Sequence, residues 1–243
     1  MGMIGGQFFW LLGTGMAVFF PFLSVRHIGK TFHQWNHVFV AVSLGLGFWL
    51  LKLPPYWGFI VMAFLFNSAF FVGPPALRKV GSVFEVFFLL LLVMGFAFEM
   101  LGSPTMVQLN QITTALLLGA TAMALIVGHW YLVAPGISFG FLKKYTWAVV
   151  VTLILRALFL SVLTWESSHV LGGEMVTYLT DVFYLMRMLF GIVMPLVFAF
   201  MALNALKYKN NQAATGILYV ALIMVIMGEL VHYVILAPQS AVY

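Results

Sequence analysis

The chain has 243 residues, of which 64% are hydrophobic and only 7% are charged, and its mean hydropathy is +1.10. A soluble core cannot hide this share of apolar surface, so the composition excludes an ordinary soluble domain and predicts a polytopic membrane protein. The net charge of +5 resides mainly in the connections between apolar runs, and no basic patch interleaved with aromatic residues indicates nucleic acid as a partner.

Apolar runs of about 20 residues, separated by Gly, Pro or charged residues, predict eight membrane spans. Continuous runs of this length fit helices, whereas β-barrel strands would give short segments of period two, so the predicted fold class is all-α. We expect a single transmembrane domain over residues 1–243, with spans at Phe8–Val25, His37–Leu53, Tyr56–Val72, Val83–Leu101, Ile112–Val133, Tyr145–Thr164, Tyr178–Lys207 and Thr215–Ile235.

The charged connections predict the orientation of these spans. The connection after the sixth span carries Glu166, Glu174 and Asp181 and no Lys or Arg. Basic residues, which favour cytoplasmic connections, follow the odd-numbered spans instead. Both termini are therefore expected outside, in a bacterial or organellar inner membrane. The basic residues in question are Arg26, Lys30, Arg78, Lys79, Lys143, Lys144, Lys207 and Lys209.

Three charges lie deep inside the apolar runs, whereas Glu85 and Glu99 lie within a turn of the two ends of the fourth run. Arg156 is near the middle of the sixth span, Arg187 is roughly two turns into the seventh, and Glu229 is in the eighth. Each charge at such a depth costs about 2.5 to 3.5 kcal/mol on insertion scales unless it is paired. We therefore expect the three side chains to form a polar cluster in the outer half of a bundle made by the last three spans.

Further polar residues extend this cluster and suggest a chemistry for it. His232 follows Glu229 at i+3 and shares its helix face. Oxidation of a quinol releases two protons, so a quinone site needs a carboxylate or imidazole beside the ring oxygen. On this hypothesis Glu229 and His232 are catalytic, and the quinone-binding residues are Arg156, Arg187, Tyr184 and Asp181. The alternatives are a structural ion pair that fixes adjacent helices and a transport pathway.

Histidines form a second constellation on the predicted cytoplasmic side. The segment RHIGKTFHQWNH contains His27, His33 and His37, and His129 lies in LIVGHWYLVAPG. Pairing His129 with His37 or His27 would supply two axial ligands to a haem b iron. The alternative is an interfacial belt formed with aromatic neighbours, and His27 and His33 are expected at the interface. These neighbours are Trp35, Trp130 and Tyr131.

The chain contains no cysteine. This excludes thiolate metal sites, Fe–S clusters bound within the chain and thiol–disulfide carriers. The motifs H-E-x-x-H and G-x-S-x-G are also absent, which removes the zinc-protease and common serine-hydrolase signatures. Any redox path through this chain therefore requires partner subunits.

Three segments occur in an informative order: LGSPTMVQLNQ at Leu101–Gln111, LMRMLFGIVMPLVF at Leu185–Phe198 and ATGILYVALIMVIMGELVHYVI at Ala214–Ile235. They resemble the LGxP-type helix end, the penultimate helix with its Gly191 and Pro195, and the last helix of one protein family. That family is the NrfD/PsrC/DmsC membrane anchors of molybdopterin and related respiratory oxidoreductases. The segments cover about a fifth of the chain.

The resemblance implies an eight-helix subunit in the lipid membrane that exchanges quinol or quinone, menaquinone or ubiquinone, at a site on its outer side. It also implies a partner subunit of Fe–S or cytochrome c type that docks there and exchanges electrons. Two alternatives stay open. One is a non-catalytic anchor or assembly subunit whose buried charges are structural, and the other is a subunit that carries haem b.

Overall fold

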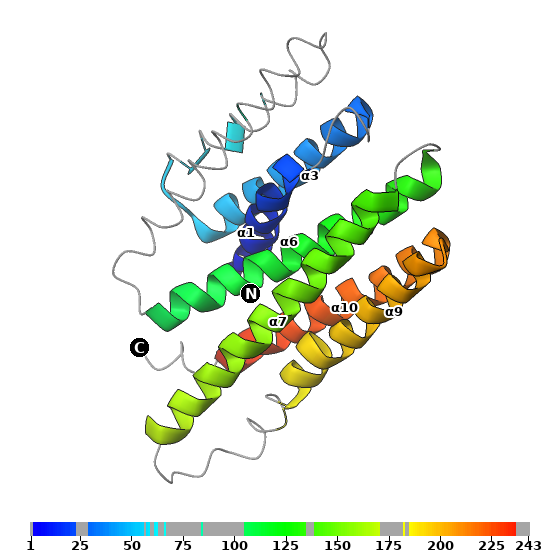
Figure 1. The fold of residues 1–243 in the computed structure, drawn as a ribbon. Helices are drawn as coiled ribbons and strands as arrows, with labels where there is room; N and C mark the ends of the chain where they lie inside the picture. The colour runs from blue at the N-terminus through cyan, green and yellow to red at the C-terminus, as the bar shows by residue number, and fades with distance from the viewer. Residues whose placement is uncertain are drawn as a thin grey trace. The chain divides into compact units, whose positions relative to one another are not determined.

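The structure, a computed structural model, describes residues 2–22, 29–55, 57–58, 61–62, 66, 84, 105–134, 139–170, 182 and 185–236 (Figure 1). Within these ranges all regular secondary structure is helical, which confirms the predicted class. Five of the helices described are long and apolar enough to cross a membrane, so the chain is a multi-pass membrane protein. These candidate spans are Thr31–Leu51, Val107–Val133, Gly140–Ser161, Leu185–Lys207 and Asn211–Val231.

The described helices coincide with six of the predicted spans, and most extend beyond the apolar run. Apolar runs mark the part of a helix in hydrocarbon, whereas backbone hydrogen bonding continues into polar flanks. The predicted spans Tyr56–Val72 and Val83–Leu101 fall almost entirely outside the described residues. The elements are α1 (Gly2–Phe19), the 3-10 turn η1 (Phe20–Phe22), α3 (Lys30–Leu51), α6 (Thr105–Val133), α7 (Phe139–Val170), the π-helical turn η2 (Leu189–Val193), α9 (Met194–Lys207) and α10 (Asn211–Leu236).

The chain divides into two compact units. Unit 1 comprises Met1–Gln111 with Gly136–Ser138, and unit 2 comprises Ile112–Pro135 with Phe139–Tyr243. In unit 1, α1 packs along α3, and Trp10 meets Trp57 edge to face with ring centroids 4.8 Å apart.

Glycines bring α1 and α3 together. A Cβ atom on Gly47 of α3 would lie 2.8 Å from both N and Cα of Trp10 on α1, closer than real Cβ atoms approach backbone. Gly13 of α1 is covered in the same way by Leu44 of α3, at 2.8 Å from its Cγ. In a bilayer there is no hydrophobic driving force between helices, because lipid tails are as apolar as the side chains. Membrane helices associate instead by van der Waals packing, and small residues allow their backbones to approach closely.

In unit 2, four helical segments form a closed ring of contacts. α9 packs against both α7 and α10, and Figure 1 shows these three side by side. α6 closes the ring, because Arg156 of α7 bonds to Thr113 of α6, and Gly128 of α6 lies against Thr215 of α10. Short connections join α6 to α7 and α9 to α10, so the two helices of each pair run in opposite directions. The described part of unit 2 is therefore a four-helix bundle.

The inward faces of this bundle follow the helical repeat. On α9 the buried positions are Pro195, Ala199, Ala202 and Leu206, a stripe of mostly small side chains. On α10 they are Asn211, Ala214, Thr215, Leu218, Ala221, Val225, Gly228 and Glu229. The opposite faces carry exposed large apolar side chains such as Val197, Phe200 and Ile223, as expected for helices that face lipid.

Replacing Gly47 by alanine tests the packing of α1 on α3. The added Cβ meets the backbone of Trp10, which cannot yield without moving α1, so we expect Gly47→Ala to destabilise unit 1 by about 1–3 kcal/mol. Thermal unfolding of the purified chain in detergent measures this as a lower midpoint. Gly45→Ala, two positions away on α3, is the matched control, because the one described atom that its Cβ meets is Val61 Cγ1 at 3.9 Å. Equal stability of the two variants would contradict the packing described.

Candidate functional site

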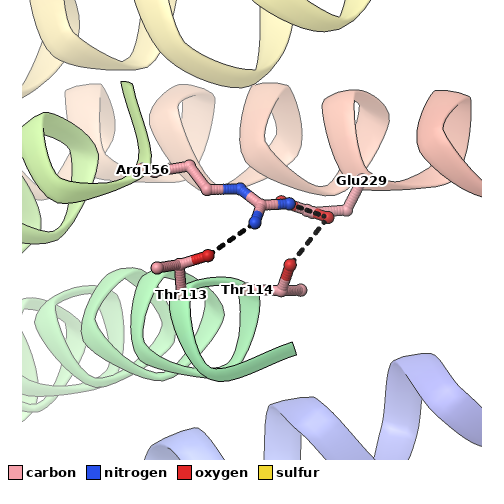
Figure 2. A network of polar contacts seen from close by, with 4 residues as sticks. All are labelled: Thr113, Thr114, Arg156 and Glu229. Atoms are coloured by element: carbon pink, nitrogen blue, oxygen red, sulfur yellow. Dashed lines mark hydrogen bonds and ion pairs between the residues drawn. The ribbon is translucent and has the colours of Figure 1, made fainter. Parts of the chain in front are cut away.

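Arg156 and Glu229 form an ion pair in the interior of unit 2. Nη2 of Arg156 lies 2.9 Å from Oε1 and 3.1 Å from Oε2 of Glu229. The two residues expose only 1% and 4% of their surface, respectively. Figure 2 shows the guanidinium and the carboxylate meeting end to end. The pair joins α7 to α10 in the interior of the bundle.

Two neighbouring threonines of α6 complete the network (Figure 2). Nη1 of Arg156 donates to Oγ1 of Thr113 at 2.6 Å, and Oγ1 of Thr114 donates to Oε2 of Glu229 at 3.2 Å. These hydroxyls stand where water would solvate the charges at a protein surface. Oε2 of the carboxylate thus accepts two hydrogen bonds and Oε1 accepts one, so Oε1 retains more acceptor capacity.

The charges are buried because each occupies a core position of its helix. On α7, the buried Leu142 and Val149 precede Arg156 at intervals of seven residues, close to two helical turns. On α10, Glu229 follows Val225 at i+4 on the stripe that faces the other helices. The guanidinium and the carboxylate therefore occupy positions that the spacing of buried residues along α7 and α10 would assign to apolar side chains.

The energetics of such a pair are asymmetric. Replacing a buried ion pair with apolar side chains of similar volume is often neutral or stabilising, whereas removing one partner costs about 3–5 kcal/mol. The loss arises because the remaining charge is left in a medium that cannot solvate it. Stability alone therefore does not explain why the chain places two charges in this core, and it makes single substitutions poor tests of function.

A π-turn lies beside the pair, at η2. The amide of Met194 donates to the carbonyl oxygen of Leu189, five residues back instead of four. Pro195 accounts for the change, since it has no amide hydrogen and its ring would crowd the carbonyl of Gly191 in a continuous α-helix. Turns of this kind occur frequently at functional sites.

The π-turn packs directly on the segment that carries Glu229. A Cβ on Gly228, the residue before Glu229, would lie 2.7 Å from the backbone N of Gly191. A Cβ on Gly191 would lie 3.3 Å from Cα of Gly228. Both glycines are buried, and their missing side chains allow the two backbones to touch. The position of Glu229 is therefore set by backbone contact as well as by its partners.

Arg187 is buried on the same helical hairpin, with 3% of its surface exposed. Arg187 lies four residues before Gly191, and Gly191 contacts Gly228 of α10. Because α10 runs in the opposite direction, the α10 residue at the same height as Arg187 is the one four residues after Gly228. That position is His232, one turn beyond Glu229. The structure thus joins Arg156 to Glu229 directly and places Arg187 on the next turn of the hairpin.

Three other predicted site residues are placed in part or not at all. His232 belongs to α10, but the structure describes only its backbone. Tyr184 and Asp181 lie outside the described residues. Their membership of the cluster stays a prediction.

The histidines of α3 are packed inside unit 1. His33 and His37 are both completely buried, one turn apart on the face of α3 that meets Phe20. Nδ1 of His37 lies 2.7 Å from the carbonyl oxygen of His33. A carbonyl can only accept, so Nδ1 of His37 carries a proton. This burial was not predicted: the helix begins at Lys30, before the apolar run, and packs His33 against Phe20. The depth of His33 in the membrane stays a prediction.

The remaining candidate haem ligands are dispersed. His129 is exposed, and its Nδ1 lies 3.2 Å from the hydroxyl of Tyr219 on α10. His27 is outside the described residues. His37 and His129 belong to different units, so their pairing stays a prediction. Among the residues that the structure describes, no group of three or more His, Asp or Glu side chains is close enough to hold a metal ion.

The hydrogen bonds of Thr113 and Thr114 and the contact between Gly191 and Gly228 were not predicted from the sequence. Thr113 and Thr114 stand together at the start of the apolar run of α6, which was the available signal for a polar partner on this helix. Gly191 and Pro195 at i and i+4 indicated a helix irregularity, and Gly228 directly before Glu229 indicated a close approach. No pattern, however, indicates which helix meets which.

No family model, curated protein or solved structure matches this chain. The functional argument therefore rests on the chemistry and geometry of the residues described above.

Thr114 provides a direct test of the network. Thr114→Val keeps the shape and removes the hydroxyl that donates to Glu229, so we expect a loss of about 0.5–2 kcal/mol in unfolding free energy. Thr121→Val, two turns along α6 and equally buried, is the control, because that hydroxyl bonds to the carbonyls of Leu117 and Leu118 in its own helix. Reversible unfolding in mixed micelles measures both. A larger loss for Thr121→Val would contradict the network.

Gly228 tests the backbone contact beside Glu229. Gly228→Ala places a methyl group against the backbone of Gly191, so we expect α9 and α10 to separate and the unfolding free energy to fall by about 1–3 kcal/mol. Gly216→Ala on the same helix has no described atom within 4 Å of its added Cβ, and we expect no loss there. The two variants are compared by thermal unfolding. A neutral Gly228→Ala would show that the helices do not touch at this point.

Proposed function

We propose that this chain is the quinone-binding membrane subunit of a multisubunit respiratory electron-transfer complex. The observation that carries the proposal is the Arg156–Glu229 pair in the core of a four-helix bundle, with hydroxyl partners and a second buried arginine on the adjacent turn. Intramembrane ionisable residues mark substrate, ion or proton sites by default, because their placement is costly.

The chemistry of a quinone suits this constellation. Oxidation of a quinol to a quinone releases two electrons and two protons, and neither can be left in hydrocarbon. Glu229 accepts a proton through Oε1, the carboxylate oxygen with more remaining acceptor capacity, and His232 on the next turn is the second acceptor. Arg156 holds the carboxylate in place and stabilises its charged form. Tyr184 and Asp181 complete the proposed site.

The electrons require a partner, because this chain has no cysteine for an Fe–S cluster. We propose an Fe–S or cytochrome c type subunit that docks on the outer side of the membrane. This arrangement agrees with the resemblance to the NrfD/PsrC/DmsC anchors. The proposed topology has eight helices with both termini outside, in a bacterial or organellar inner membrane.

The exposed lysines support a site in the outer half. Lys143, Lys144, Lys207 and Lys209 are exposed at the end of unit 2 where α6 meets α7 and α9 meets α10. Arg156 lies 13 residues along α7 from Lys143, which is roughly 20 Å at 1.5 Å per residue. Since the hydrocarbon layer is about 30 Å thick and basic residues favour the cytoplasm, the pair falls nearer the outer face.

A second function is a non-catalytic anchor or assembly subunit. The closed network favours it, because both carboxylate oxygens and two guanidinium nitrogens have partners inside the bundle. In that case the pair only fixes how α6, α7 and α10 meet. A haem b subunit would instead centre on His37, His129 and His27, away from this pair.

The double variant Arg156→Met/Glu229→Met separates the two functions. Removing both charges leaves no uncompensated ion, so we expect the chain to assemble as well as the native one. If Glu229 is the proton acceptor, quinol-dependent turnover of the assembled complex falls by about 100-fold or more. Blue-native electrophoresis measures assembly, and quinol-driven electron transfer in membranes measures turnover.

Turnover at the native rate in the assembled double variant would refute the catalytic role and leave the anchor. Leu153→Met, one turn from Arg156 on α7 and also buried, is the control for methionine in this core, and both functions predict that it stays active.

A further inference from the structure

Four exposed lysines gather at one end of unit 2, which we call the lysine end. Lys143 and Lys144 lie in the first two turns of α7, and Lys207 and Lys209 lie where α9 stops. Figure 1 shows the start of α7 and the stop of α9 at the same end of the unit, and the two helices pack against each other. Two pairs of ammonium groups therefore lie on neighbouring helices.

The acidic side chains of unit 2 do not neutralise this charge. Glu229 lies roughly 27 Å from the start of α10 and is already paired, and Glu166 lies roughly 33 Å beyond Lys144 along α7. Glu174 and Asp181 follow α7 in the sequence and lie outside the described residues. Among the described residues of unit 2, no Asp or Glu is thus near the lysine end, which attracts anions.

Aromatic residues place the lysine end at the level of the lipid headgroups. Trp147, one turn after Lys143, and Tyr208, between Lys207 and Lys209, are both exposed. Trp and Tyr are enriched where hydrocarbon meets the headgroups. Only three residues connect α9 to α10, so the ammonium groups stay close to the ends of the helices. They are therefore within reach of lipid phosphates.

Lys209 occupies a position that glycine usually fills. Its φ of 58° is left-handed, its amide donates to the carbonyl of Leu206 at 3.1 Å, and the amide of Asn210 donates to the carbonyl of Ala205 at 3.0 Å. These two bonds define a Schellman motif, in which glycine is favoured because a side chain is strained in this conformation. A lysine is kept here at a cost to the backbone, and strained positions of this kind cluster at binding sites.

We infer that the lysine end binds an anionic phospholipid with two phosphates, of the cardiolipin class, and that each phosphate is held by one pair of lysines. Charge complementarity carries this inference, because a lipid with two linked phosphates matches two lysine pairs on helices whose axes pack about 8–10 Å apart. Basic sites between membrane helices on the cytoplasmic side suit such headgroups. The acyl chains lie against exposed apolar side chains of α7 and α9, such as Val151 and Phe200. The inference is independent of the proposed quinone chemistry.

Native mass spectrometry of the full chain in detergent tests the site with three probes: cardiolipin, phosphatidylglycerol and phosphatidylcholine. We expect cardiolipin to bind about tenfold or more tightly than phosphatidylglycerol, because its second phosphate is paired without a second association step. Lys143→Gln/Lys144→Gln and Lys207→Gln/Lys209→Gln should each weaken cardiolipin binding by about tenfold or more and remove this preference. Equal binding of the two anionic lipids to the native chain, or undiminished cardiolipin binding in either double variant, would overturn the inference.

Lys52 provides a matched control for Lys209. Lys52 is exposed, follows α3 with a φ of 52°, and has the same pattern of backbone bonds. Lys52→Gly and Lys209→Gly remove the same charge and relieve the same strain, so we expect similar unfolding midpoints in lipid-free detergent. Only Lys209→Gly should weaken cardiolipin binding, by about fivefold. An equal loss in both variants would show a response to net charge alone and would rule out the site.

A second measurement separates a lipid from a partner protein. Added cardiolipin should raise the unfolding midpoint of the native chain by mass action and should leave that of both double variants unchanged. An acidic segment of a partner subunit would use the same lysines. Loss of a subunit from the complex purified with either double variant, with cardiolipin binding intact, would overturn the lipid assignment.

Discussion

A guanidinium and a carboxylate placed together in hydrocarbon constrain everything around them. Arg156 and Glu229 reach each other from α7 and α10, so the distance between these two helices must match the combined length of the two side chains. Water cannot complete their hydrogen bonding at this depth, and Thr113 and Thr114 supply it from α6. Three helices are therefore held in one register by four side chains.

The contact between η2 and α10 depends on the backbone and not on polar side chains. Gly191 and Gly228 let η2 and α10 touch, and the contact lies directly beside Glu229. A π-turn at this point is stable because Pro195 has already removed one amide from the ladder. Irregular backbone, close helix approach and buried charge thus occur within two turns of one another. Where several local rules are broken together, a function is the usual reason.

The sequence predicted most of the described helices and the two charged residues of the network, but neither threonine. Runs of apolar residues predicted the helices of unit 2 because hydrocarbon imposes a strict length, and the cost of charge singled out Arg156, Arg187 and Glu229. The structure pairs Arg156 with Glu229, two of the three charges that were expected to cluster.

The remaining features depend on tertiary contacts that no local pattern encodes. Thr113 and Thr114 became relevant only because α6 lies between the two charged helices. The inward phase of Arg187 requires a π-turn, and a strict α-helical repeat places Met188 there instead. The burial of His33 was missed because polar residues begin α3 before its apolar run, and the contact with α1 then covers them.

The central claim is that Glu229 takes the proton of a quinol, and infrared difference spectroscopy tests it most directly. The bound quinol is oxidised electrochemically in the native protein and in the uncharged pair Arg156→Gln/Glu229→Gln, which leaves no unpaired charge in the core. Proton transfer to Glu229 predicts a new protonated-carboxyl band in the native spectrum that is missing from the variant. The same carboxyl band in both proteins, or no carboxyl band in the native protein, would contradict the assignment.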